Sequence, residues 1–172
     1  HIREIKPQVV VTFDPIGGYK HPDHIAIHRA TVLAFNLAGE TTFQNGLPPY
    51  QPQKLYYHTF PKTRLRWMVR LAPLMGMDPK RMGRNRDMNF AELVAEADFP
   101  IHARVNYRSV LAEKDAAAAC HASQLGGAMG RRGLISLLMR HIDHNDAYMR
   151  AVPPPVNRQL ERDLFEGVLT TT

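Results

Sequence analysis

The sequence predicts an α/β fold, because segments with strand and helix patterns alternate along the chain. Residues 8–13 (QVVVTF) are a short, β-branched apolar run, typical of a strand buried on both faces. Residues 25–37 carry apolar side chains at helical spacing, and Gly39 supplies a stop signal. Strand, turn and helix in this order are half of a βαβ unit.

The rest of the chain continues this alternation. A polar, Pro-rich loop is expected over residues 41–53, and a lid-like excursion over the Met/Gly/Arg segment that ends near residue 87. The three prolines at 153–155 should end the last strand. The expected strands are residues 54–60, 97–107 and 146–155, and the expected helices are residues 62–72, 107–127 and 131–142.

Composition excludes several classes of protein. The 172 residues are enough for a single domain, which we expect to cover residues 1–172. No apolar run approaches the ~20 residues of a membrane span, and the single cysteine excludes an intramolecular disulfide and fits a cytoplasmic protein. The net charge of +6 comes from scattered basic residues without a nucleic-acid-binding motif, so no nucleic acid partner is expected.

The turn that follows the first strand carries the densest chemistry. Residues 14–24 read DPIGGYKHPDH, at the position where open α/β sheets bind their ligands. Gly17 and Gly18 let a ligand approach the backbone closely, and with Asp14 they are our candidate substrate-binding residues. Imidazole binds zinc or transfers protons near neutral pH, and a neighbouring carboxylate can fix its tautomer.

His24 and His28 are spaced to share one face of the following helix. This i, i+4 spacing could form a metal-binding pair, or His28 could simply pack against its neighbours. The residues alone leave both interpretations open. They also leave a metal site and an acid–base site as alternatives for the turn.

Residues 6–30 (KPQVVVTFDPIGGYKHPDHIAIHRA) resemble the PIG-L/LmbE-like zinc-dependent deacetylases, which act on N-acetylglucosamine (GlcNAc) conjugates. A weaker likeness covers residues 114–124 (KDAAAACHASQ). The resemblance implies a Rossmann-like three-layer sandwich with a largely parallel sheet. It also implies a single Zn²⁺ and hydrolysis of the N-acetyl group of an amino-sugar conjugate.

The same resemblance assigns roles within the turn. His24 would be a zinc ligand, and His21 would stabilise the tetrahedral intermediate and protonate the leaving amine. Asp23 would orient His21, and Tyr19 would approach the substrate. His28 is not a ligand in this scheme, so the resemblance favours the packing role.

One departure from the family concerns its N-terminal His-Pro-Asp-Asp-like motif, which supplies the other zinc ligands and the general base. HPDH is the only His-Pro pair in this chain, and the chain starts with HIREIK, without an initiator Met. We therefore expect a C-terminal fragment that is inactive alone and self-associates through its exposed sheet edge. The alternative functions are a non-catalytic binding module and, from net charge only, a nucleic-acid-associated domain.

Overall fold

The structure is a computed structural model, and it describes residues 1–81, 89–95, 98–120, 144–157 and 159–169. The chain divides into two compact units. The first consists of His1–Phe60, Phe99–Val105 and Ala147–Thr172, and the second of Pro61–Asp98 and Asn106–Asp146. The expected helix at residues 131–142 lies outside the described residues, as do His121 to Gln124 of the weaker likeness.

A four-stranded sheet runs through the fold, in the order β1-β2-β4-β3. Strand β1 (Val9–Phe13) pairs in parallel with β2 (Lys54–Thr59), whereas β4 (Asn145–Val152) is antiparallel to β2, and β3 (Ala103–Asn106) lies beside β4. The sheet is therefore mixed, and the expectation of a largely parallel sheet is wrong for the described strands. A strand pattern carries no information about direction, so the sequence of β4 could not reveal its reversal.

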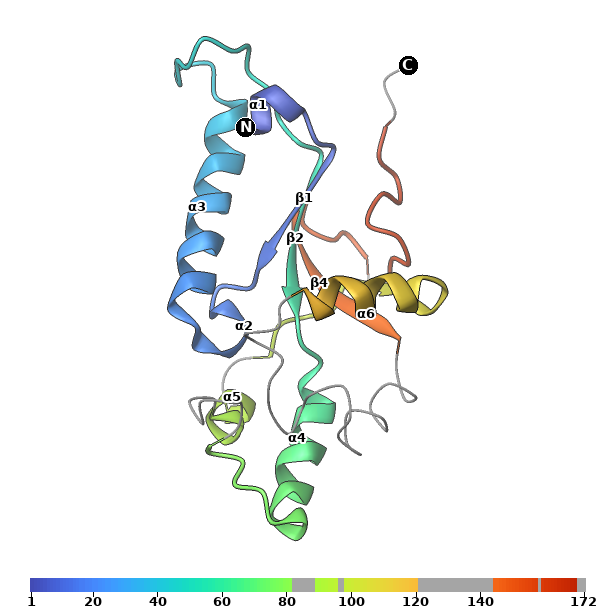
Figure 1. Cartoon of the computed structure of the whole chain (residues 1–172). Coiled ribbons are helices and arrows are strands. Elements are labelled where there is room, and N and C mark those ends of the chain that lie inside the picture. The colour runs from blue at the N-terminus through green and yellow to red at the C-terminus, as the bar shows by residue number, and fades with distance from the viewer. Residues whose placement is uncertain (82–88, 96–97, 121–143, 158, 170–172) are drawn as a thin grey trace. The chain divides into compact units, whose positions relative to one another are not determined.

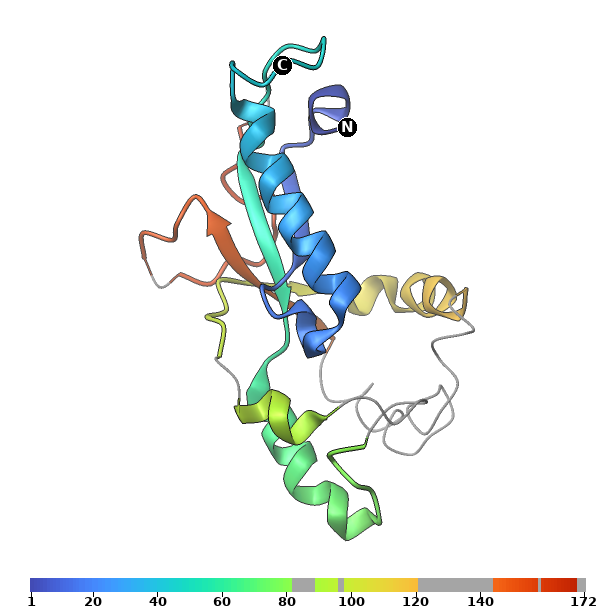
Figure 2. The same ribbon diagram turned by 90° about the vertical axis from the view of Figure 1, so that its left-hand side faces the viewer.

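The parallel β1–β2 pair is connected through helix α3 (Pro22–Gly39), which lies along the sheet (Figure 1; Figure 2). Parallel neighbours need such a crossover, and α3 confirms the predicted β–turn–α unit. Pro22 occupies the first turn of the helix, where its missing N–H costs nothing. Phe35 and Ala38 of α3 are buried with Leu55 and Tyr56 of β2, and these side chains belong to the core of the first unit.

The carboxyl end of α3 is held by an arginine from the start of the chain. Arg3 lies in the short helix α1 (Ile2–Ile5) and is only 3% exposed. Its guanidinium donates hydrogen bonds to the carbonyl oxygens of Leu37, Ala38 and Glu40 at the end of α3, and to those of Phe43 and Leu47 in the following loop. The Leu37 and Ala38 carbonyls also accept from the backbone N–H groups of Glu40 and Tyr50, so Arg3 adds to the hydrogen bonds at the end of α3 and connects that end to the following loop.

Strand β1 is less buried than its composition predicts. Val11 is 45% exposed, whereas Thr12 is buried. The expectation of a strand buried on both faces is therefore wrong for the described part of the chain, because β1 lies at the edge of this sheet. Apolar side chains of α3 are also exposed, namely Ile27 and Leu33.

The described helices of the second unit are α4 (Lys62–Leu71), the 3-10 turn η1 (Ala72–Met75), α5 (Phe90–Ala95), the 3-10 turn η2 (Arg108–Val110) and α6 (Leu111–Ala119). Ala72, Phe90 and Leu93 are its buried apolar side chains among the described residues. The predicted helices at 62–72 and 107–127 are confirmed in part, since residues from 121 lie outside the described ranges. None of the described helices is long and apolar enough to cross a membrane.

Candidate functional site

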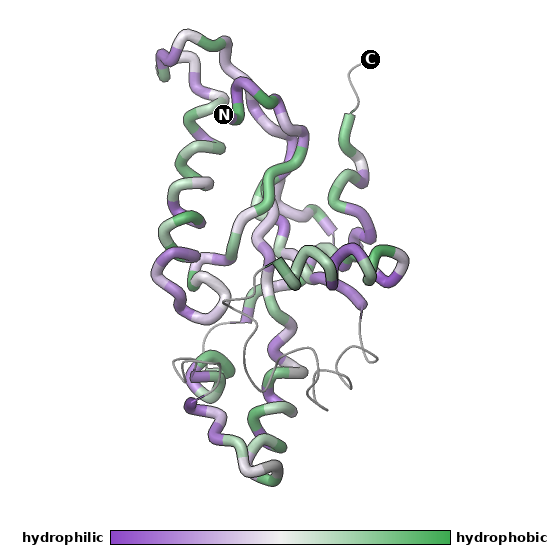
Figure 3. Tube along the Cα trace, viewed as in Figure 1, coloured by the Kyte–Doolittle hydropathy of each residue, from purple (hydrophilic) through white to green (hydrophobic). Residues whose placement is uncertain are grey.

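The turn at residues 14–24, here called the HPDH turn, joins the carboxyl end of β1 to α3, as predicted. Its residues around the start of α3 are hydrophilic (Figure 3). The first part of the turn contains the single-turn helix α2 (Gly17–Lys20). Asp14 is 1% exposed, and its Oδ1 accepts a hydrogen bond of 2.8 Å from the Gly18 N–H. The Asp14 carboxylate thus fixes the backbone of the turn.

Both glycines of the turn have left-handed backbone angles, with φ of +66° at Gly17 and +72° at Gly18. A Cβ at Gly17 would lie 2.9 Å from the backbone nitrogen of Ile25, which the helix holds in place. A Cβ at Gly18 would lie 3.2 Å from the Phe60 ring. The sharp return of the chain onto α3 therefore requires glycine most strictly at Gly17.

The His24 ring is oriented by two contacts. Its Nδ1 lies 3.2 Å from the carbonyl oxygen of Gly17, and its ring stacks on Phe13 with centroids 3.9 Å apart and planes 5° apart. A carbonyl oxygen only accepts, so Nδ1 carries the hydrogen. In the neutral ring Nε2 is then left with its lone pair, which suits a metal ligand.

The His21 ring has the opposite arrangement. It is the N-cap of α3, and its Nδ1 accepts a hydrogen bond of 3.2 Å from the Asp23 backbone N–H. The neutral ring therefore carries its hydrogen on Nε2, as a donor. The two rings are 4.7 Å apart between centroids. The backbone thus selects a donor nitrogen on His21 and an acceptor nitrogen on His24, side by side.

The two other predicted catalytic residues lie next to this pair. The Tyr19 ring meets both imidazoles edge-on, at 5.7 Å from His21 and 5.2 Å from His24. The Asp23 carboxylate is 89% exposed, and its Oδ2 lies 3.9 Å from the His21 Nδ1. Asp23 therefore contacts His21 through its backbone N–H, and its carboxylate is placed to pair with His21 when that ring is protonated.

His28 lies one helical turn after His24 and is buried. Its Nδ1 lies 2.7 Å from the carbonyl oxygen of Phe13, and its ring meets Tyr57 edge-on at 4.8 Å. The Nδ1 of His28 is thus bound to the backbone in the same way as that of His24, and it is the burial of the ring beside Tyr57 that favours the packing interpretation over the i, i+4 metal pair. Within the described ranges no group of three or more His, Cys, Asp or Glu side chains could hold a metal ion.

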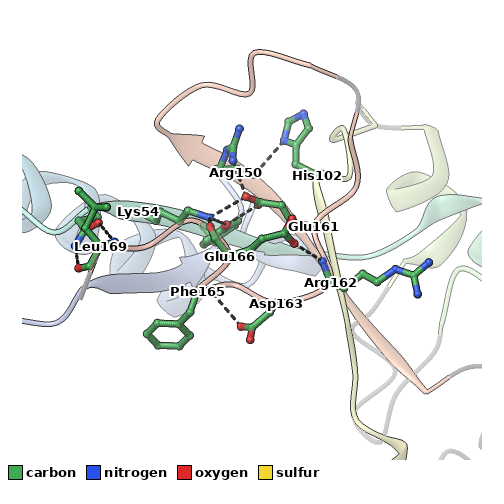
Figure 4. Close-up of polar contacts among 11 residues, drawn as sticks. Lys54, His102, Arg150, Glu161, Arg162, Asp163, Phe165, Glu166 and Leu169 are labelled. Atoms are coloured by element: carbon green, nitrogen blue, oxygen red, sulfur yellow. Dashed lines mark hydrogen bonds and ion pairs between the residues drawn. The ribbon is translucent and has the colours of Figure 1, made fainter. Parts of the chain in front are cut away.

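A second polar group in the same unit was not predicted. It is here called the Glu161 cluster (Lys54, Tyr56, Arg150 and Glu161), and Figure 4 shows Lys54 and Arg150 beside Glu161. Lys54 Nζ donates to Glu161 Oε1 at 2.8 Å, Tyr56 OH to Oε2 at 2.6 Å, and an Arg150 guanidinium nitrogen to Oε1 at 2.6 Å. Lys54 and Glu161 are 107 positions apart, so no local spacing could reveal the pair. The only signal was a lysine within an apolar strand.

The surroundings of the Glu161 cluster shift the pKa of Glu161, of Tyr56 and of the nearby His102. Burial alone would raise the pKa of Glu161, but the hydrogen bonds from Lys54 and Tyr56 and the two nearby positive charges lower it on balance. Burial, reinforced by the Glu161 carboxylate, raises the pKa of Tyr56. Nearby, burial and the Arg150 charge lower the pKa of His102. Glu161 is therefore ionised, and Tyr56 neutral, around pH 7.

Comparison with known proteins gives related sequences over most of the chain. The family described as "PIG-L: GlcNAc-PI de-N-acetylase" matches residues 1–35. A 1D-myo-inositol 2-acetamido-2-deoxy-alpha-D-glucopyranoside deacetylase of Tsukamurella paurometabola is 35% identical over 97% of this chain and 56% of its own length. The enzyme of the same name from Streptomyces scabiei is 31% identical over 97% of this chain and 52% of its length. The chain spans about half the length of these relatives.

A solved structure shares the fold. The conserved protein TT1542 from Thermus thermophilus superposes with a TM-score of 0.53, at 16% sequence identity, over 91% of this chain and 57% of that protein. The family match lies on β1, the HPDH turn and most of α3, which are the elements that build the candidate site. Together, the family match and the curated relatives support a PIG-L/LmbE-like deacetylase.

Proposed function

We propose that this chain is the C-terminal part of a zinc-dependent N-deacetylase whose substrate is an N-acetylated amino-sugar conjugate of the GlcNAc–inositol type. The observation that carries this proposal is the pair of opposite tautomers on His21 and His24. Amide hydrolysis needs both a ligand nitrogen and a proton donor beside the scissile bond. The names of the relatives support the substrate class.

The donor chemistry of His24 fits one zinc ligand, because its Nε2 lone pair is free for a metal while Nδ1–H is held by a carbonyl. When bound, zinc supplies a Lewis acid that makes a coordinated water nucleophilic near neutral pH. Catalytic zinc sites have about three protein ligands, so the remaining ones would come from outside the described residues. We propose that these ligands come from the part of the protein beyond residues 1–172, so that the fragment alone is inactive.

His21 supplies the proton that amide cleavage requires. Water adds its oxygen to the acetyl carbon and gives a proton to a general base that would lie outside the described residues, the C–N bond breaks, and the nitrogen leaves as an amine after gaining a proton. The Nε2–H of His21 stabilises the negative charge on the carbonyl oxygen as the carbon becomes tetrahedral. His21 transfers the proton to the nitrogen as an imidazolium, protonated also on Nδ1 and paired there with the Asp23 carboxylate, so that a neutral ring is left. Asp23 orients His21, and the Tyr19 hydroxyl approaches the carbonyl oxygen.

The remaining predicted residues shape the surface that the substrate meets. Gly17 and Gly18 are buried, so they would act on the substrate through the path of the turn, which Asp14 fixes at Gly18. In the whole protein we place the parallel β1–β2 pair within a Rossmann-like sandwich, and the protein in the cytoplasm as a homo-oligomer. Light scattering of the purified protein tests the last point.

The test uses the protein at its natural length. Zinc content is measured by mass spectrometry, and acetate release is measured with GlcNAc–inositol. We expect His24→Ala to lose both zinc and activity, and His21→Asn to retain zinc while activity falls by about 10²–10⁴-fold. A wild-type protein with neither zinc nor acetate release would overturn the proposal in favour of the binding module.

A further inference from the structure

His28 is a buried side chain to which neither the proposed chemistry nor zinc binding assigns a role. It is 9% exposed and lies on α3 one turn after His24. Because the Phe13 carbonyl oxygen only accepts, the His28 Nδ1 donates the 2.7 Å hydrogen bond between them. The edge-on Tyr57 ring holds the other side of the imidazole. His28 is therefore bound to the last residue of β1.

That residue also forms the platform for His24. The Phe13 ring stacks on the His24 imidazole, and the Phe13 carbonyl receives the His28 hydrogen bond. His24 in turn donates to the Gly17 carbonyl. Two histidines that lie four residues apart on α3 thus form hydrogen bonds with the backbone that precedes the helix. His28 binds Phe13 at the end of β1, and His24 binds Gly17 within the HPDH turn.

We propose that His28 is a positioning residue, which fixes Phe13 and thereby holds His24 in the orientation that leaves its Nε2 free. A shift of the Phe13 backbone would move the stacked ring, and the His24 Nδ1–H would no longer align with the Gly17 carbonyl. The consequence for zinc rests on the proposed function, but the control of the His24 ring does not. A packing role alone would require only the volume of His28.

Three variants separate these roles. His28→Asn keeps an N–H donor near the place of Nδ1, His28→Gln moves the donor one bond further along the side chain, and His28→Leu fills the space without a donor. The protein at its natural length is used, without zinc, at about pH 9, where imidazoles are neutral. Long-range ¹H–¹⁵N correlation spectra report the tautomer of each histidine, and the His24→Ala spectrum assigns the His24 signals.

In the wild type and in His28→Asn we expect His24 to be held as the single Nδ1–H tautomer. In His28→Leu and His28→Gln we expect a mixture of both tautomers. A His24 tautomer that is unchanged in folded His28→Leu would overturn the proposal. If the Leu variant does not fold, the same comparison is made between the Asn and Gln variants, and an unchanged His24 tautomer in folded His28→Gln would overturn the proposal. If none of the three variants folds, His28 has a structural role only, which also overturns the proposal.

Zinc binding gives the second readout. We expect His28→Leu to weaken zinc affinity roughly 10–100-fold, as loss of groups that orient a ligand typically does, and His28→Asn to restore it. Equal zinc affinity in the wild type and the Leu variant would contradict the proposal. A wild-type protein that binds no zinc would instead overturn the proposed function, and the tautomer comparison would still decide the role of His28.

Discussion

The HPDH turn and the Glu161 cluster are both polar groups within the first unit of the fold, but they use their polar atoms differently. In the Glu161 cluster the charged side chains bind one another, with Lys54, Tyr56 and Arg150 all donating to one carboxylate. In the HPDH turn, each of His21 and His24 gives one ring nitrogen to the backbone. The second nitrogen of each ring is left for chemistry.

This difference indicates that the Glu161 cluster stabilises the fold, whereas the HPDH turn keeps ring nitrogens available for a ligand or substrate. Glu161 joins the segment after β4 to β2, and its backbone also forms hydrogen bonds with His102, just before β3, and with Arg104 in β3. The Glu161 carboxylate already accepts hydrogen bonds from three side chains, which leaves it little capacity for a ligand. A neutral imidazole with one bonded nitrogen keeps a donor or an acceptor in a fixed direction, and the choice between them is made by the backbone.

Removal of the central carboxylate should have the largest effect on stability. Glu161→Ala leaves the buried Lys54 and the partly buried Arg150 without their partner, and we expect the free energy of unfolding to fall by about 3–5 kcal/mol. Urea denaturation measures this loss. The control is Asp98→Ala, which breaks an ion pair with Arg66 that is about half exposed and should cost under ~1 kcal/mol. Equal losses would contradict the distinction.

Substitution of the turn glycines should have the next largest effect. Gly17→Ala combines a left-handed backbone with a Cβ pressed against the Ile25 nitrogen, and we expect a loss of about 2–4 kcal/mol. Gly18→Ala meets only the exposed Phe60 ring, which can move, so about 1–2 kcal/mol is expected. Thermal unfolding compares the stability of the two variants. A larger loss of stability in Gly18→Ala than in Gly17→Ala would contradict the close approach of Gly17 to the Ile25 backbone.

The helix cap formed by His21 offers a smaller and sharper test. His21→Ala removes the acceptor for the Asp23 N–H and should cost about 1 kcal/mol, whereas His21→Asn supplies another good cap and should stay within about 0.5 kcal/mol of the wild type. The Asn variant should nevertheless lose activity, because it lacks the Nε2–H donor. Denaturation measures the stability of the two variants, and acetate release measures their activity. A fully active Asn variant would show that His21 has no catalytic role.

The smallest effect should come from His102, whose Nδ1 accepts the Arg150 backbone N–H. Burial and the Arg150 charge lower its pKa from the ordinary 6.5, so the unfolded chain binds more protons than the folded chain just below pH 6.5. Stability from this group is therefore present above pH 6.5 and is lost as the pH falls through the folded pKa. His102→Asn keeps an acceptor and should flatten this part of the stability–pH curve; an unchanged slope would contradict the assignment.

Much of the fold could be predicted from local patterns. The strand at residues 8–13, the following helix and the strand at 54–60 correspond to β1, α3 and β2 within a few residues. Their order gives the parallel pair, because a helix crossover fixes strand direction. The reversed β4 and the exposure of Val11 could not be predicted, since both depend on which strands lie side by side.

The candidate site was predictable in its residues but not in its hydrogen bonds. The density of His, Asp and Gly after a strand pointed to the HPDH turn, and Tyr19, His21 and His24 do lie together. The tautomers depend on which backbone atom meets each Nδ1, and only the folded turn decides this. The burial of Asp14 and the Phe13–His28 bond likewise depend on the path of the chain back onto α3.

The most direct test of this account is the tautomeric state of the two histidines in the wild-type protein, read from long-range ¹H–¹⁵N correlations at about pH 9. We predict a hydrogen on Nδ1 of His24 and on Nε2 of His21. A hydrogen on Nε2 of His24 would occupy the lone pair assigned to zinc and would contradict the account. A hydrogen on Nδ1 of His21 would equally remove the Nε2–H donor assigned to the carbonyl oxygen of the substrate.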